Sequence, residues 1–461
     1  MSIQQEAGLT AGERLDRLSF GAPHRRILVL IGSGMFLDAM ELYLAGGVLG
    51  ALVKEGYSTV ALNAQFISWT FFGLVIGAWF AGILGDRYGR RFCYQLNLAI
   101  FGLASLAAAA SPSMQVLIAC RFVMGIGLGA EIVIGYGTLS EFVPANVRGR
   151  AVSMLALLTN MAVFVSAFLG LWIIPNFGWR YMFVIVGVCA IGVWFLRKSM
   201  PESPRWLESK GRFAEADVIL RKMETESGVT GPVRQSTVAV PTEPVAVSVV
   251  FSRPLITRTL VGILLNVVMG FCLYGFLGWL PTFFVKQGFS IASSLQWTTV
   301  MGLGGPVGGL IGWLVADRWG RKWTVVTASL VAAVMGVIYP NVHDQNLLMA
   351  VGFVLVTAAY VIVAVGFALW VPELYETRYR MRGAAVCSTA GRLTTAGVQF
   401  VVVALFGWGG VSAVVGVLVA MLVFQAVIFA VFAMETRQRA LEKIPQGNGG
   451  VGGGVSAAVA S

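Results

Sequence analysis

"GDRYGRR" (residues 85–91) has a near copy in the second half of the chain, "ADRWGRK" (residues 316–322). The acids of the two copies, Asp86 and Asp317, are 231 residues apart (317 − 86). Each copy follows a long apolar run and contains one acid and three basic residues. A near copy at about half the length of the chain indicates an internal repeat.

Further matches support the repeat, because they occur in the same order and at nearly the same separation. They are Gly73 and Gly77 with Gly304 and Gly308, "EFVPANVRG" (141–149) with "ELYETRYRMRG" (373–383), "FGW" (177–179) with "FGW" (406–408), and "PES" (201–203) with "MET" (434–436). Two homologous halves of this kind are typical of membrane transporters.

The composition is that of a membrane protein. The chain has 461 residues, of which 57% are hydrophobic and 12% charged, whereas soluble domains carry about 25% charged residues. Runs of about 20 apolar residues are long enough to cross a bilayer as helices. The chain therefore reads as an all-α membrane protein with two pseudo-symmetric six-helix bundles. The twelve expected transmembrane helices are 27–52, 63–84, 93–110, 115–140, 151–174, 179–197, 257–285, 294–316, 323–340, 346–371, 384–406 and 411–433.

The polar segments give the expected domain organisation. It is an N-terminal tail (1–26), a first bundle (27–198), a linker with a short amphipathic helix (199–256), a second bundle (257–434) and a C-terminal tail (435–461). The basic clusters lie in the loops on the same side as both termini. By the positive-inside rule, both termini are cytoplasmic in a multi-pass plasma membrane protein, in a bacterium the inner membrane.

Several function classes are disfavoured. The net charge of +11 lies in loops that orient the helices, so we expect no nucleic-acid partner. The five cysteines show no metal-ligand spacing, and we expect neither a metal nor a cofactor. No phosphate-binding glycine loop is present, and the two histidines, His24 and His343, lie in a tail and a loop. We therefore expect no enzyme activity.

The paired loops, "EFVPANVRGR" (141–150) and "PESPRWL" (201–207) resemble the major facilitator superfamily in its sugar-porter-related branch. The resemblance implies alternating access by two rocking bundles. It also implies a charged latch that controls conformation without touching substrate, although the same charges could serve only to orient the helices. The latch residues would be Asp86, Arg87, Arg90, Glu141, Arg148, Asp317, Arg318, Arg321, Glu373 and Arg380.

Charges inside the predicted spans are the sharpest functional signal. In "FLDAMELYLAGG" (36–47), Asp38 and Glu41 project from one helix face, because they are three residues apart. A charge at mid-bilayer costs about 3 kcal/mol, so it tends to face a cavity or a partner. Other charges lie at similar depth in the fourth and eleventh helices: Arg121, Glu131 and Arg392.

The resemblance places Glu41 and Arg121 where proton-coupled sugar porters have an acid and an arginine. It implies a proton switch in which protonation of the acid frees the arginine; the alternative is a static ion pair. Asp38 and Glu131 are then additional acids. Either could bind the proton or contact substrate, and Glu131 could equally make a structural hydrogen bond.

A sugar substrate is disfavoured. Sugar porters present amides on their fifth and seventh helices, and this chain keeps Asn266 but has Val163, Val267 and Cys272 at the other places. Unpaired sugar hydroxyls would cost about 1–3 kcal/mol each.

An organic anion fits better. Arg392 occupies a place where organic-anion carriers have an arginine, and a guanidinium can bind a carboxylate through two charge-assisted hydrogen bonds. "DAMELYLAGG" and "FLGWLP" resemble segments of bacterial niacin and aromatic-acid carriers. The other candidate substrate residues are Tyr43, Asn266, Tyr274, Trp279, Tyr360, Phe367 and Trp370, although aromatic residues in membrane helices more often pack in the core or face lipid.

We therefore expect a secondary transporter, functional as a monomer, that imports a small aromatic or heteroaromatic monocarboxylate such as nicotinate by proton symport. An exporter, an organic-cation carrier or a sugar carrier would share this fold. A membrane sensor that binds ligand without transport is a more remote alternative.

Overall fold

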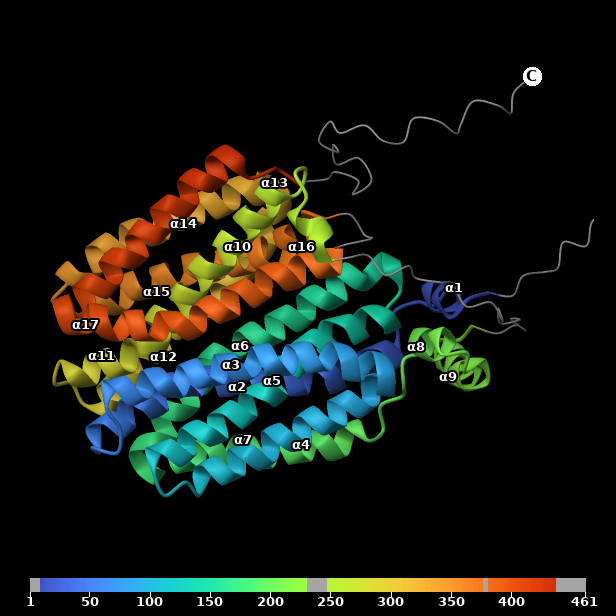
Figure 1. Ribbon diagram of the computed structural model, residues 1–461, viewed down its shortest axis with the longest axis horizontal. Coiled ribbons are helices and arrows are strands. Elements are labelled where there is room, and N and C mark those ends of the chain that lie inside the picture. Colours follow the sequence, from blue (N-terminus) through green and yellow to red (C-terminus); the bar gives the residue numbers. More distant parts are fainter. Residues whose placement is uncertain (1–8, 230–246, 376–379, 437–461) are drawn as a thin grey trace, which may run out of the picture.

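The computed structural model describes residues 9–229, 247–375 and 380–436. The described chain is built from helices arranged in two groups, one made by the first half of the sequence and the other by the second (Figure 1). The predicted all-α membrane fold is confirmed. Within the described residues, eleven helices are long and apolar enough to cross a membrane. The last of them consists of two spans joined at a kink, which makes twelve.

The first half contributes six long helices, and their bounds extend the predicted spans by a few residues at most ends. They are α2 (Ala22–Lys54), α3 (Val60–Tyr88), α4 (Arg90–Ala109), α5 (Met114–Phe142), α6 (Ala145–Phe177) and α7 (Arg180–Arg197).

The second half is more irregular. Its first span is divided into α10 (Ile256–Gly270), the π-helix η2 (Phe271–Phe276), the short 3₁₀ turn η3 (Leu277–Trp279) and α11 (Leu280–Lys286). Pro281 is the second residue of α11, and because it has no N–H it cannot continue the preceding hydrogen-bond ladder, which explains the break at that point. The spans that follow are α12 (Ile291–Gly302) with α13 (Gly304–Trp319), α14 (Arg321–Ile338), and α15 (Gln345–Ile362) with the π-helix η5 (Val363–Trp370) and α16 (Val371–Glu373).

The last two spans share the label α17 (Arg380–Phe432), which comprises two helices joined at a kink. Its backbone leaves the helical region at Gly409 and Gly410, where φ reaches 64° at Gly410. The turn that the sequence places between 406 and 411 is therefore this glycine kink.

Glycines allow α3 and α5 to pack at backbone distance. A Cβ on Gly77 would lie 1.9 Å from the carbonyl oxygen of Ile126, and a Cβ on Gly129 would lie 2.0 Å from that of Leu74. Membrane helices associate largely through such close packing of small residues. These glycines hold together two helices that carry or flank the buried charges described below.

The two halves meet at the end of the molecule where α11 and α12 lie (Figure 1). A Cβ on Gly46 of α2 would lie 2.9 Å from the carbonyl oxygen of Gly278, and one on Gly50 would lie 3.3 Å from Pro281. Nearer the middle, the hydroxyl of Ser68 on α3 donates a 2.6 Å hydrogen bond to the carbonyl of Ala396 on α17. Helix α2 therefore packs closely against the divided first span of the second half.

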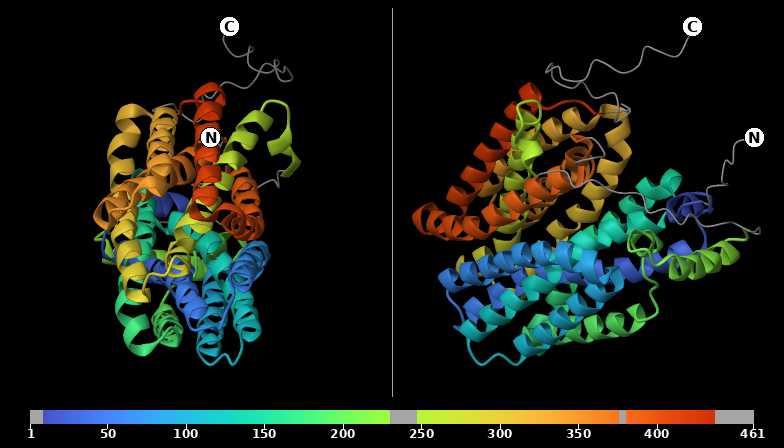
Figure 2. Two further views of the ribbon diagram at one scale, coloured as in Figure 1. Left: turned by 90° about the vertical axis from the view of Figure 1, so that its left-hand side faces the viewer. Right: turned by 45° about the vertical axis from the view of Figure 1, so that its right-hand side comes forward.

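Three short helices lie at the opposite end of the molecule: α1 (Ala11–Asp16), α8 (Pro204–Ser209) and α9 (Phe213–Glu226) (Figures 1 and 2). We call this end of the molecule, which also holds the loops at 85–91 and 316–322, the basic end. Arg14 of α1 is buried and donates two hydrogen bonds to Glu224, at 2.8 and 2.7 Å, and one to Asp217, at 2.7 Å. The first helix of the N-terminal segment is thus fixed to α9.

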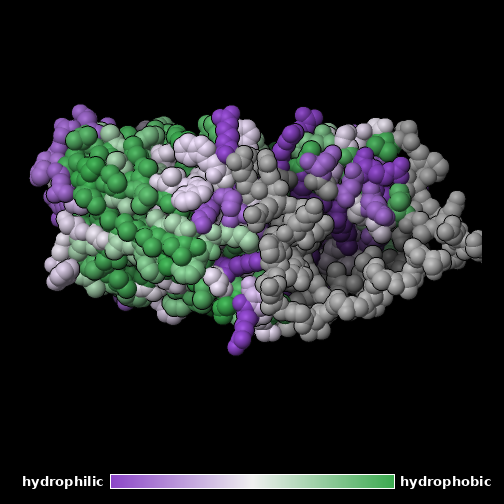
Figure 3. All heavy atoms as spheres, turned by 90° about the horizontal axis from the view of Figure 1, so that it is seen from above, coloured by the Kyte–Doolittle hydropathy of each residue, from purple (hydrophilic) through white to green (hydrophobic). Residues whose placement is uncertain are grey.

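The surface of the molecule is apolar along its length and polar at its two ends. Hydrophobic side chains cover most of the left-hand part of Figure 3, with hydrophilic residues at its left edge and across the right-hand part, which includes the basic end. Apolar surface between two polar ends is what a bilayer-spanning protein requires.

Replacing Gly129 by alanine tests the close packing of α3 and α5. The new methyl group would overlap the backbone oxygen of Leu74, so we expect Gly129→Ala to lower the thermal unfolding temperature of the purified protein markedly. Gly137→Ala is the matched control on the same helix, because a Cβ there meets nothing within 4 Å. Equal stability of the two variants would show that the helices do not pack as described.

Candidate functional site

The first candidate site is a buried ion pair between α2 and α5. Glu41 and Arg121 are 0% and 1% exposed, and Arg121 Nη1 donates to Glu41 Oε1. Arg121 Nε also donates to the hydroxyl of Thr70 at 3.3 Å, and the guanidinium lies over the ring of Phe66, 4.6 Å from its centroid. The pair therefore joins three helices, and its two charges balance.

A second group of charges lies closer to the basic end of the same half. Glu131 of α5 forms an ion pair with Arg197 of α7 at 2.5 Å. Asp38 of α2 is buried beside this pair, and its Oδ2 atom has no hydrogen-bond partner. Asp38 and Glu41, which are neighbours on one helix face, thus belong to different charge groups.

Arg197 is the functional candidate that the sequence analysis missed. It is the last residue of the sixth predicted span, where an arginine is normally read as a topology signal at the membrane surface. Its long side chain instead turns inward and is fully buried. The sequence did contain a signal for this contact. Asp38 and Glu131 are acids without an assigned partner, and an arginine at the end of a neighbouring helix can supply one.

A third cluster lies where the halves meet, and tyrosines dominate it. The rings of Tyr43 on α2 and Tyr274 on η2 stack with centroids 6.1 Å apart, and Phe71 on α3 packs edge-on against Tyr274 at 4.6 Å. The buried hydroxyl of Tyr360 on α15 interacts with the hydroxyl of Tyr43. Three helical elements from both halves thus bring tyrosine hydroxyls together.

Arg392 of α17 belongs to this tyrosine cluster. Its side chain is half-buried, and its electrostatic neighbour is Tyr274. Among the described residues, no carboxylate forms an ion pair with Arg392. This differs from Arg121 and Arg197, each of which has an acid.

A small cavity borders the cluster between α2, α6, η3, α11 and α12. It offers about 30 Å³ to the centre of a water molecule, which is room for roughly two waters. Tyr43, Ser166 and Thr298 contribute hydroxyls to its lining, whereas Val163 and Pro281 contribute apolar surface. Of the cluster residues only Tyr43 lines this cavity, which is small in this conformation.

The other candidate substrate residues have neighbours elsewhere. Trp279 donates from Nε1 to Gln399 at 2.7 Å, Asn266 donates to the carbonyl of Gly262 at 2.8 Å, and Trp370 donates to the carbonyl of Met434 at 2.8 Å. Phe367 is 40% exposed. The partners of these hydrogen bonds do not include Arg392, although Asn266 packs against the neighbouring Gly391.

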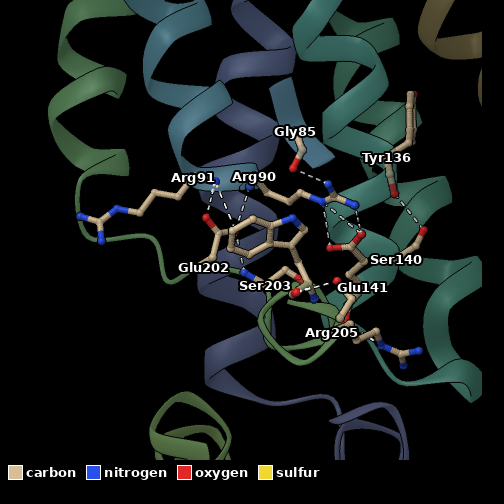
Figure 4. Close-up of polar contacts among 11 residues, drawn as sticks. Gly85, Arg90, Arg91, Tyr136, Ser140, Glu141, Glu202, Ser203 and Arg205 are labelled. Carbon is tan, nitrogen blue, oxygen red and sulfur yellow. Dashed lines mark hydrogen bonds and ion pairs between the residues drawn. The ribbon is translucent and has the colours of Figure 1, made fainter. Parts of the chain in front are cut away.

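Two of the predicted latch residues of the first half, Arg90 and Glu141, form an ion pair beside a helix cap. Arg90 binds Glu141 at 2.9 Å and donates to the carbonyl of Gly85 at 2.7 Å (Figure 4). The carboxylate of Glu202 accepts the backbone N–H groups of Arg90 at 2.8 Å and Arg91 at 3.2 Å. An acid at this place satisfies the free N–H groups at the start of α4 and complements the helix dipole.

The second half repeats this arrangement. Arg321 binds Glu373 at 3.1 Å, and Glu435 accepts the backbone N–H groups of Arg321 and Lys322 at 2.9 and 3.1 Å. The "PES" and "MET" motifs therefore supply equivalent acids, Glu202 and Glu435.

Both caps require a glycine before the helix. Gly89 and Gly320 have φ of 97° and 83°, and a Cβ on either would collide with the carboxylate of Glu202 or Glu435.

The remaining predicted latch residues are placed as follows. Arg148 Nη2 lies 3.8 Å from Oδ1 of Asp16. Asp16, at the end of α1, is not among the predicted latch residues. Arg87 and Arg318 are exposed. The side chains of Asp86, Asp317 and Arg380 lie outside the part of the structure that is described. The described Arg90–Glu141 and Arg321–Glu373 pairs each lie within one half of the protein.

Comparisons with known proteins agree with this architecture. The family described as "Sugar (and other) transporter" matches residues 46–447. An inner membrane metabolite transport protein of Escherichia coli, YdjE, is 36% identical over 95% of this chain and 98% of its own length. The niacin transporter NiaP of Acinetobacter baylyi is 30% identical over 94% of this chain and 98% of its own length. Among solved structures, the inward-open conformation of the Escherichia coli xylose transporter XylE has a TM-score of 0.71 at 17% identity, covering 91% of this chain and 98% of that one.

The acid cap of α4 is testable through Glu202. Loss of a helix cap costs about 1 kcal/mol, so we expect Glu202→Ala to lower the unfolding temperature, while Glu226→Ala, at an exposed position of α9, leaves it unchanged. Burial raises the pKa of the Glu202 carboxyl. The folded state therefore binds this proton more readily than the unfolded state, and the contribution of Glu202 to stability decreases as the pH rises through the folded pKa.

Glu202→Gln keeps an oxygen acceptor without the charge. Its stability relative to the wild type should therefore improve as the pH rises from acidic to neutral in thermal unfolding experiments. A constant difference across this range would contradict a buried, ionising cap.

Proposed function

Because the chain belongs to the sugar (and other) transporter family of the major facilitator superfamily, we propose that it imports a small aromatic or heteroaromatic monocarboxylate, such as nicotinate, together with protons. The family and its relatives are membrane transporters and not enzymes. The observation that carries the substrate proposal is Arg392, a half-buried arginine with no acid partner among the described residues. Its electrostatic neighbour, Tyr274, belongs to the tyrosine cluster where the halves meet.

Electrostatics favours an anion at this place. An unpaired guanidinium away from bulk water is costly, and a substrate carboxylate would neutralise it through two parallel hydrogen bonds. The stacked rings of Tyr43 and Tyr274 offer flat apolar surface for an aromatic ring, while their hydroxyls can bind a ring nitrogen or a substituent. The similarity to a niacin transporter supports this substrate class.

The alternatives of the same fold fit less well. An organic cation would be repelled by Arg392. A sugar would face Val163 in the cavity lining, where its hydroxyls would lack amide partners. The family and the relatives of this chain are transporters, which argues against a sensor that binds without transport.

Proton coupling is proposed through Glu41 and Arg121. Protonation of Glu41 would remove the charge that holds Arg121, and deprotonation would restore the pair, so the contact between α2 and α5 would respond to the proton gradient. The basic end is proposed to face the cytoplasm with both termini. The halves pack closely at the other end, through Gly46 and Gly50, which supports an inward-facing conformation.

Arg392→Ala tests the anion site. We expect the purified variant to lose binding of nicotinate and related aromatic acids by at least about tenfold, since a charge-assisted bond contributes about 1.5–3 kcal/mol. Arg392→Lys keeps the charge without the two-bond geometry and should bind with intermediate affinity. A thermal-shift and calorimetry screen that includes sugars and organic cations provides the measurement. Wild-type affinity in Arg392→Ala would remove the anion proposal.

Glu41→Gln tests the coupling. In proteoliposomes this variant should still exchange substrate in counterflow, because exchange needs no net proton movement, and should lose accumulation driven by a pH gradient. Accumulation at the wild-type level in Glu41→Gln would place the coupling at another acid.

A further inference from the structure

The group formed by Asp38, Glu131 and Arg197 is not explained by the ion pair at Glu41. Asp38, Glu131 and Arg197 are 2%, 1% and 0% exposed, and they come from α2, α5 and α7. The charges that act on Asp38 are those of Glu131 on α5, Arg197 on α7 and Glu41 on its own helix. On α4, Tyr94 faces the group, with the guanidinium of Arg197 4.6 Å from the centroid of its ring.

Arg197 is held in place by more than its acid. It donates from Nε to the carbonyl of Leu30 at 2.7 Å and from Nη2 to the carbonyl of Ile31 at 2.8 Å. Gly34, one helical turn before Asp38, leaves the space in which the pair sits: a Cβ there would overlap Arg197 Nη2 and lie 2.7 Å from Glu131 Oε1. The chain thus provides a built pocket for this arginine against the side of α2.

The charges of this group do not balance. Glu41 and Arg121 together carry no net charge, whereas two carboxylates and one guanidinium leave one negative charge. A buried uncompensated charge is expensive, and two neighbouring carboxylates in such a place cannot both stay ionised. Oδ2 of Asp38, Oε2 of Glu131 and Nη1 of Arg197 also lack hydrogen-bond partners.

We propose that Asp38 and Glu131 bind one proton between them, with Arg197 as the counter-charge, at a site separate from the Glu41–Arg121 pair. The proton converts one of the two carboxylates into a neutral acid, so that the group as a whole becomes uncharged. The O–H of this neutral acid can then donate a hydrogen bond to one of the unpartnered carboxylate oxygens. No other reactant is needed, since the proton comes from water on the side that is open.

This site deepens the proposed proton coupling and rests on it for its role in transport. Asp38 and Glu41 are three residues apart on one face of α2, which puts their Cβ atoms about 5–6 Å apart, and the charge of Glu41 acts on Asp38. A proton that leaves Glu41 when the pair with Arg121 forms therefore has an acceptor towards the basic end. In this conformation Glu41 is paired with Arg121, which leaves the group around Asp38 as the place for the proton.

Infrared difference spectroscopy of the full-length protein in lipid nanodiscs tests the site without substrate or transport. At neutral pH the wild type should show the C=O stretching band of a protonated carboxylic acid, shielded from rapid hydrogen–deuterium exchange. Asp38→Asn and Glu131→Gln should each lose it, because either change leaves one acid balanced by Arg197. Glu41→Gln and the exposed control Glu226→Gln should keep it.

Two results would overturn the proposal: absence of the band in the wild type, or its persistence in either folded acid variant. If one of the two variants does not fold, the other gives the same test. Because the measurement needs no ligand, it can fail while nicotinate still binds, and it can succeed while the substrate proposal fails.

Discussion

The constraint on which the structure depends is that charges buried among apolar helices must be neutralised. Arg121 is matched by Glu41 and Arg197 by Glu131, and each match joins α5 to another helix of the first half. Arg392 in the second half is the arginine that the described residues leave without an acid. A buried charge that the protein does not neutralise itself can be neutralised by a substrate of opposite charge. In the same way, two neighbouring acids with only one basic partner can be neutralised by a proton.

The internal repeat explains why the two halves look alike at the basic end and different in the middle. Each half uses an arginine, a glutamate and a capping acid: Arg90 with Glu141 and Glu202, and Arg321 with Glu373 and Glu435. The middle has diverged: ion pairs occupy the first half, whereas π-helices, tyrosines and Arg392 occupy the second. A π-helix displaces side chains from regular helical positions and is often found at functional sites, and η2 carries Tyr274.

The fold could be predicted almost completely from sequence, because apolar run length and the repeat are direct consequences of the bilayer. The contact of Glu41 with Arg121 was also expected, from the resemblance to proton-coupled sugar porters, while its role as a switch stays a prediction. Arg197 could not be placed in this way, since an arginine at a helix end can turn outward or inward and only the tertiary structure decides. The same holds for Arg14, whose buried contacts with Glu224 and Asp217 join segments about 200 residues apart in sequence.

The most direct test of the account is a double-mutant cycle on Glu41 and Arg121, measured as unfolding free energy in detergent or nanodiscs. Removing one partner of a buried pair leaves an uncompensated charge and costs about 3–5 kcal/mol, whereas removing both costs far less than the sum. We predict that Glu41→Gln and Arg121→Gln each destabilise strongly and that the double variant recovers a large part of the loss. Simple additivity of the two losses would contradict the claim that neutralisation of buried charge organises this protein.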